Sequence, residues 1–109
     1  MDAAWIEAAT TWLRDAVSRL PAGTALSVSE RIVDGPVEGW WFTIAAPHVQ
    51  TGAGSNRAAT LKVTATYDDA LRAARTVYPP GAAATLTSVP EALRPVLVDL
   101  HNHMAGLTS

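Results

Sequence analysis

The chain has 109 residues, no cysteine, and eight basic against ten acidic residues, for a formal net charge of −2. This length predicts one domain, residues 1–109, that can bury a core; the missing cysteines exclude disulfides, thiolate zinc sites and thiol nucleophiles. The lack of a basic cluster argues against nucleic acid as a partner. No apolar run approaches the roughly 18 residues of a membrane span, and the start lacks a basic secretory signal, so we expect a cytoplasmic protein.

Residues 1–21 are predicted to form an amphipathic N-terminal helix. The apolar residues from Trp5 to Leu20 recur at helical spacing and fall on a single stripe. Pro21 and Gly23 should end the helix, because proline cannot continue it and glycine accepts the backbone angles of the exit.

Residues 24–67 are predicted to contain the strands. Residues 24–33 alternate, and Asp34-Gly-Pro then turns the chain into a hairpin. In the next strand Trp40, Phe42 and Ile44 should face the core, because strand side chains alternate with a period of two. The neighbouring Trp41 must therefore lie on the opposite face.

The second half of this region contains a loop and another strand. Residues 48–56 are predicted to be a loop in which residues 48–51 form a short edge strand as an alternative. Gly52-Ala53-Gly54 fits a flexible hairpin loop, since no helix follows as a phosphate-binding loop would need. Residues 61–67 alternate again, with Leu61 and Val63 on the apolar face. We expect a largely antiparallel sheet of four to five strands.

Two further helices are predicted. The first covers residues 68–78, with Asp68 or Asp69 as its N-cap and Pro79-Pro80-Gly81 as its stop. Residues 82–87 fit a short strand or a loop.

The C-terminal helix is predicted for residues 88–107. Ser88 and Glu91 have the spacing of a capping box. Pro95 either kinks this helix or marks its true start, and Gly106 should end it. The helices should pack on one face of the sheet, which makes the fold class α+β.

Few ionisable residues stand out as candidates for chemistry. Glu30 falls on the apolar face of its strand, where a raised pKa would suit a general acid or base, although a shift of one residue in the pleat would place it in water. His101 and His103 diverge on a helix and cannot share one ion. Asp99 and His103 face together but lack further ligands, so no metal site is predicted.

From residue 24 to residue 107 the chain resembles the sterol carrier protein type 2 family, especially its small single-domain bacterial members. The resemblance lies in a Gly-Pro turn followed by an aromatic strand (DGPVEGWWFTI, 34–44), a short strand and loop (48–56), and an alternating strand that enters a helix (ATLKVTATYDDAL, 59–71). It implies non-catalytic binding or carriage of a lipid, acyl chain or sterol-like molecule, with no cofactor, in a cavity between the sheet and the C-terminal helix. The implied lining is Trp40, Phe42, Ile44, Leu61, Val63, Leu97, Leu100 and Met104.

Three alternatives remain open. These eight residues can instead simply fill a core. For the fold itself, the alternative is a nuclear transport factor 2-like or cystatin-like cone with a long first helix. The same cavity can belong to a small isomerase or cyclase that uses Glu30 as acid or base, aided by His48. A third interpretation is an interaction module or homodimer anchored by the outward Trp41.

Overall fold

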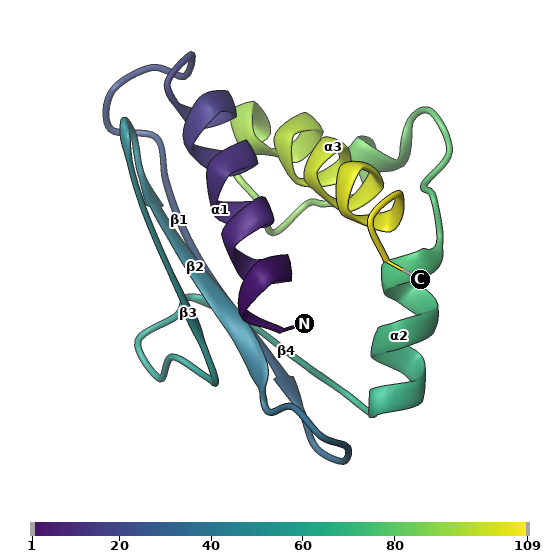
Figure 1. The fold of residues 1–109 in the computed structure, drawn as a ribbon. Coiled ribbons are helices and arrows are strands. Elements are labelled where there is room, and N and C mark those ends of the chain that lie inside the picture. The colour runs from purple at the N-terminus through teal and green to yellow at the C-terminus, as the bar shows by residue number, and fades with distance from the viewer. Residues whose placement is uncertain (1, 109) are drawn as a thin grey trace.

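A four-stranded sheet carries three α-helices on one of its faces in the computed structural model, which describes residues 2–108 (Figure 1). This arrangement confirms the predicted α+β class, with a mostly antiparallel sheet and the helices on one side. In chain order the elements are α1 (Ala3–Val17), β1 (Ala25–Ile32), β2 (Gly39–Ala45), β3 (His48–Ala53), β4 (Leu61–Ala65), α2 (Tyr67–Arg75), the 3-10 helices η1 (Ala82–Thr85) and η2 (Glu91–Leu93), and α3 (Arg94–Ala105).

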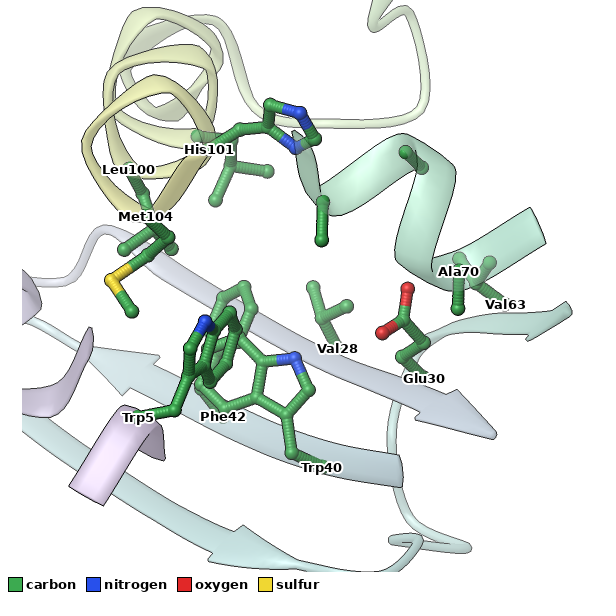
Figure 2. Close-up of a pocket in the computed structure, with 13 residues that line it drawn as sticks. Trp5, Val28, Glu30, Trp40, Phe42, Val63, Ala70, Leu100, His101 and Met104 are labelled. Atoms are coloured by element: carbon green, nitrogen blue, oxygen red, sulfur yellow. The ribbon is translucent and has the colours of Figure 1, made fainter. Parts of the chain in front are cut away.

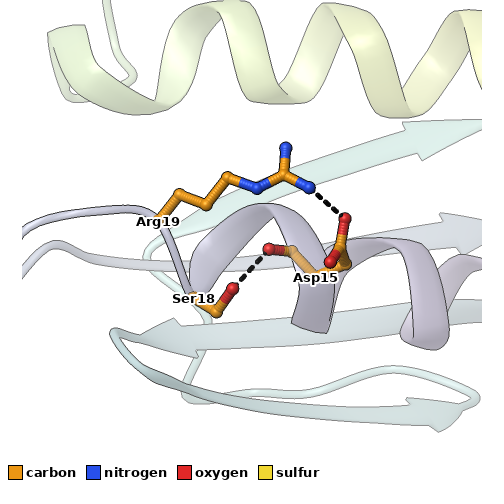
Figure 3. Close-up of polar contacts among 3 residues, drawn as sticks. All are labelled: Asp15, Ser18 and Arg19. Carbon is orange, nitrogen blue, oxygen red and sulfur yellow. Dashed lines mark hydrogen bonds and ion pairs between the residues drawn. The ribbon is translucent and has the colours of Figure 1, made fainter.

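The ends of α1 are set by local hydrogen bonds. At its start the Asp2 carboxylate accepts a hydrogen bond from the Trp5 backbone N–H at 2.8 Å, which satisfies one of the free donors of the first turn. At its end the Ser18 hydroxyl donates to the Asp15 carbonyl at 2.6 Å, and Arg19 pairs with the Asp15 carboxylate at 2.6 Å (Figure 3). The helix therefore ends earlier than the predicted 1–21 range, since the chain tightens into a turn before it reaches the proline.

The strand order is β3-β2-β1-β4. β1 pairs antiparallel with β2, which confirms the predicted hairpin, and β2 pairs antiparallel with β3. β4 lies at the far edge and runs parallel to β1, which the sequence did not indicate. A parallel pair needs a crossover, and here the chain between β3 and β4 makes it.

The crossover runs beneath the face of the sheet that carries no helix. Asn56 donates its backbone N–H to the Ser29 hydroxyl at 3.0 Å, and the Thr60 hydroxyl donates to the Ser27 carbonyl at 3.2 Å. Ser29 is consequently buried, at 4% exposed. The prediction that Gly52-Ala53-Gly54 is a hairpin loop was wrong: Gly52 and Ala53 are the end of the edge strand β3, which extends the alternative prediction for residues 48–51.

The pleat of β1 and β2 follows the predicted alternation. Trp40, Phe42 and Ile44 are buried beneath the helices, while Trp41 is half-buried on the other face. There Trp41 lies over Gly52, where a Cβ atom would come within 2.6 Å of the indole ring. Glu30 is directly opposite Trp40 in the register of β1 and β2.

Helix α2 begins and ends differently from the prediction of 68–78. Its N-cap is Thr66, whose hydroxyl accepts a hydrogen bond from the Asp69 backbone N–H at 3.2 Å. The prediction that Asp68 or Asp69 is the cap was therefore wrong. Both aspartates lie in the first turn, where a negative charge favours the positive end of the helix dipole. The helix ends at Arg75, before the prolines, because Thr76 is already extended.

The C-terminal region is more broken than the predicted 88–107 helix. Ser88 makes no capping hydrogen bond. The 3-10 helix η2 comes next along the chain, and α3 then begins at Arg94 with Pro95 in its first turn. Pro95 thus marks the helix start, where its missing N–H is harmless. The short strand considered for residues 82–87 is instead η1.

The core lies between the sheet and helices α1 and α3. Its most enclosed large side chains are Leu13, Val17, Ile44 and Leu93. The radius of gyration is 13.1 Å, close to the value of about 13 Å for a single compact domain of this length. Within residues 2–108 no helix is both long and apolar enough to cross a bilayer.

Candidate binding cavity

A cavity of about 210 Å³ lies between the sheet and helices α2 and α3, with Trp5 of α1 closing one end (Figure 2). Its sheet wall consists of the side chains that β1, β2 and β4 point toward the helices, namely Val28, Glu30, Trp40, Phe42 and Val63. This wall follows directly from the period-two alternation of the strands.

The helix wall explains why space remains there. Helix α2 contributes only Ala70, Ala73 and Ala74, whose side chains end at Cβ and do not reach across to the sheet. Helix α3 contributes larger side chains, which are Leu97, Leu100, His101 and Met104.

Aromatic rings form the floor of the cavity. The Trp5 and Trp40 rings meet edge to face, with centroids 5.0 Å apart and planes at 87°. Trp40 also contacts Phe42, with centroids 5.1 Å apart and planes at 39°. Edge-to-face and tilted contacts at these distances are favourable, so the three rings support one another in fixed positions.

Glu30 is the one acidic side chain of this wall, and its carboxylate points into the cavity in Figure 2. Burial raises the pKa of the Glu30 carboxyl above its ordinary value, because the apolar surroundings disfavour the charged form. Within residues 2–108 no side chain or backbone N–H donates a hydrogen bond to this carboxylate. The cavity therefore has an acidic group whose hydrogen-bonding capacity no described residue uses.

His101 lies at the rim, where α3 meets the segment that follows α2. Its Nε2 atom is 2.6 Å from the Thr76 carbonyl oxygen, and its ring stacks on Tyr78 with centroids 4.1 Å apart. Asn102 accepts a hydrogen bond from the Tyr78 backbone N–H at 2.8 Å and donates to its carbonyl at 3.4 Å. These contacts fix the rim of the cavity.

Most of the predicted lining meets at this cavity. Ile44 is instead fully buried in the core, and Leu61 packs against that core. Trp5, Val28, the α2 alanines and His101 were not predicted. Trp5 could have been found from the apolar stripe of its helix, whereas alanines give no such signal. The predicted residues that do line the cavity are Trp40, Phe42, Val63, Leu97, Leu100 and Met104.

Other candidate residues lie away from this cavity. His48 is exposed at the start of β3, two strands from Glu30, so the structure does not bring these two side chains together. His103 stacks on Trp12, with centroids 6.0 Å apart. No group of three or more potential metal-ligating side chains occurs in the part of the chain that the structure describes. A role for Trp41 in binding a partner stays a prediction.

A scan of protein-family models and searches of curated proteins and of solved structures found no match to this chain. The resemblance to the sterol carrier protein type 2 family therefore stays a prediction. The chemistry of the cavity is what remains to indicate a function.

Proposed function

We propose that the protein binds a small apolar molecule in this cavity without transforming it. The observation that carries the proposal is a space of about 210 Å³, lined mostly by aromatic and aliphatic side chains, that the protein's own residues leave unfilled. Empty apolar space lowers stability by about 24 cal/mol per Å³, so this space, which is partly open to water, costs less than a closed void of the same volume, for which the cost is about 5 kcal/mol. A guest that fills the space recovers part of this free energy.

The volume limits the size of the guest. An engineered apolar cavity of about 150 Å³ holds benzene, so a cavity somewhat larger than this suits an alkylbenzene or a short acyl chain. A four-ring sterol is too large to be enclosed in about 210 Å³. Within the predicted class of lipid, acyl chain or sterol-like molecule, the proposal therefore favours the smallest members. Each Å² of apolar surface that they bury contributes about 25 cal/mol.

A pair of matched variants tests the proposal. Ala74→Leu places a larger side chain in the cavity, while Ala92→Leu makes the same change on an exposed residue of η2. Native and denaturing mass spectrometry of the purified proteins should show a small molecule released from the wild type and from Ala92→Leu, and little or none from Ala74→Leu.

Propylbenzene provides a second measurement that does not depend on what survives purification. At 100 times its dissociation constant, a ligand that binds only the folded state stabilises it by about 2.7 kcal/mol, which thermal melting detects. We expect this increase in the wild type and in Ala92→Leu only. A wild type that releases no small molecule and shows no increase with propylbenzene would contradict the proposal.

A small isomerase or cyclase is the second candidate function, and it is favoured by the raised pKa of Glu30 in the cavity wall. Such an enzyme would use the same cavity with Glu30 as its acid or base. Any turnover of a bound compound that persists unchanged in Glu30→Gln would contradict this role.

A further inference from the structure

Two polar groups that make no hydrogen bond with any described residue lie side by side in the cavity wall. Glu30 and Trp40 are directly opposite each other on β1 and β2, which places their Cβ atoms about 4.5–5.5 Å apart on the same face of the sheet. Both side chains line the cavity, and Figure 2 shows the carboxylate and the indole nitrogen on the side that faces it.

Neither group is hydrogen-bonded within residues 2–108, although the positive charge of the amino terminus acts on the Glu30 carboxylate. Across residues 2–108, neither the Glu30 carboxylate nor the Trp40 indole N–H has a hydrogen-bond partner. The same residues contain no side-chain nitrogen or oxygen atom that is both fully enclosed and unpartnered. The unpartnered indole N–H is therefore not fully enclosed, and Figure 2 shows it on the side of Trp40 that faces the cavity.

The two groups have complementary requirements. The indole N–H is a donor only, and an ionised carboxylate is an acceptor only. A hydroxyl group is both an acceptor and a donor, so one hydroxyl oxygen placed between them can satisfy both. His101 does not compete for this position through Nε2, which is already engaged by the Thr76 carbonyl.

We propose that the ligand is a small apolar alcohol or phenol whose hydroxyl group donates to the Glu30 carboxylate and accepts from the Trp40 indole N–H. This inference rests on the proposed binding function and specifies its ligand class. A hydrocarbon would leave both polar groups unpartnered, and an ether would accept from Trp40 but donate nothing to Glu30. An ammonium group would suit Glu30 but would meet the positive edge of the indole ring.

Four probes of similar size separate these classes: 4-propylphenol, 4-propylanisole, propylbenzene and 4-propylbenzylamine. The four tryptophans give four indole N–H signals in a ¹⁵N-correlation spectrum, and Trp40→Phe identifies the signal of Trp40. We expect the phenol and the anisole to move this signal downfield, and propylbenzene to leave it without such a shift. The phenol should bind about tenfold more tightly than propylbenzene, as expected for a hydrogen bond to a charged group.

Two variants test whether Glu30 and Trp40 cause the preference for the phenol. Glu30→Leu removes the acceptor and should abolish the preference for the phenol over propylbenzene. This variant should bind propylbenzene at least as tightly as the wild type does. Trp40→Phe keeps an aromatic ring but loses the N–H donor, so it should weaken the binding of the phenol and of the anisole roughly threefold to tenfold. The matched controls are Glu38→Leu, at an exposed position, and Trp12→Phe, outside the cavity; both should behave like the wild type.

The results can separate failure of this inference from failure of the binding function. Equal binding of the phenol and propylbenzene by the wild type would overturn the hydroxyl proposal and leave the binding function standing. Tightest binding of the amine would also overturn it, in favour of a cationic ligand. If none of the four probes binds, both proposals are wrong. The wild-type series decides these outcomes even if a variant does not fold.

Discussion

Burial of Glu30 couples the protonation of one carboxyl to the stability of the whole domain. Its pKa is raised chiefly by desolvation, and the positive charge of the amino terminus acts in the opposite direction with a smaller effect. Between the unfolded pKa of about 4.3 and the raised folded pKa, the folded state binds more protons than the unfolded state. The free energy of unfolding must therefore fall as pH rises through this range.

Replacing Glu30 by glutamine should remove this pH-dependent loss. We expect the unfolding free energy of Glu30→Gln, measured by urea denaturation at several pH values, to exceed that of the wild type at pH 7. The difference should shrink as pH falls through and below about 4.3, where the wild-type carboxyl becomes protonated in both states. Glu38→Gln, at an exposed side chain, is the matched control. A difference that is constant with pH would show that Glu30 is not the group responsible.

The alternation of side chains along a strand made the positions of several cavity residues predictable. The inward positions of Glu30, Trp40 and Phe42 follow from the period of a strand, and the structure confirms them. The rim at His101 could not be predicted in the same way, because its position depends on Thr76 and Tyr78, which meet it only through the tertiary fold.

At the scale of elements, one glycine allows β1 and β2 to approach as closely as they do. Gly39 has φ +125°, and a Cβ atom there would lie 1.9 Å from the backbone oxygen of Glu30. This is far inside van der Waals contact, so any side chain would force the two strands apart. The same approach places Glu30 beside Trp40, so the glycine also supports the cavity wall.

Gly39→Ala should therefore be much more destabilising than a matched change at Gly23. Gly23 also has positive φ, +89°, but a Cβ atom there would have no neighbour within 4 Å. Gly23→Ala should cost only the left-handed backbone strain of about 1–2 kcal/mol. Gly39→Ala adds a clash between the strands, so we expect at least twice this loss in urea denaturation. Equal losses would argue against the close approach of β1 and β2.

The order and pairing of elements were only partly predictable. The β1–β2 hairpin follows from the turn residues between its strands, whereas the parallel placement of β4 depends on a crossover whose glycine-rich start fits a hairpin loop equally well. Helix α2 is capped by Thr66 and not by an aspartate because Thr66, which joins β4 to the helix, already offers a hydroxyl at the right spacing.

At the scale of the whole molecule, the cavity exists because large and small side chains are divided between its walls. Aromatic rings lie on the sheet side and alanines on α2, so the two layers do not fill the space between them. Six of the eight residues predicted as lining lie on this cavity, whereas Ile44 and Leu61 lie elsewhere and Trp5 and Val28 were not predicted. The cavity itself was expected only from the family resemblance and from no residue pattern, because a gap depends on how closely two layers pack and on no single residue.

The methyl group of Met104 offers the most direct measurement of whether this cavity admits an apolar molecule. The chain has two methionines, Met1 and Met104, and Met104 lines the cavity. Labelling with ¹³C-methyl methionine and titration with propylbenzene should move the Met104 signal to a saturating limit in the wild type, through the ring current of the guest. The same titration should leave Ala74→Leu unchanged. A wild-type Met104 signal that does not move up to the solubility limit of propylbenzene would contradict a binding cavity between the sheet and the helices.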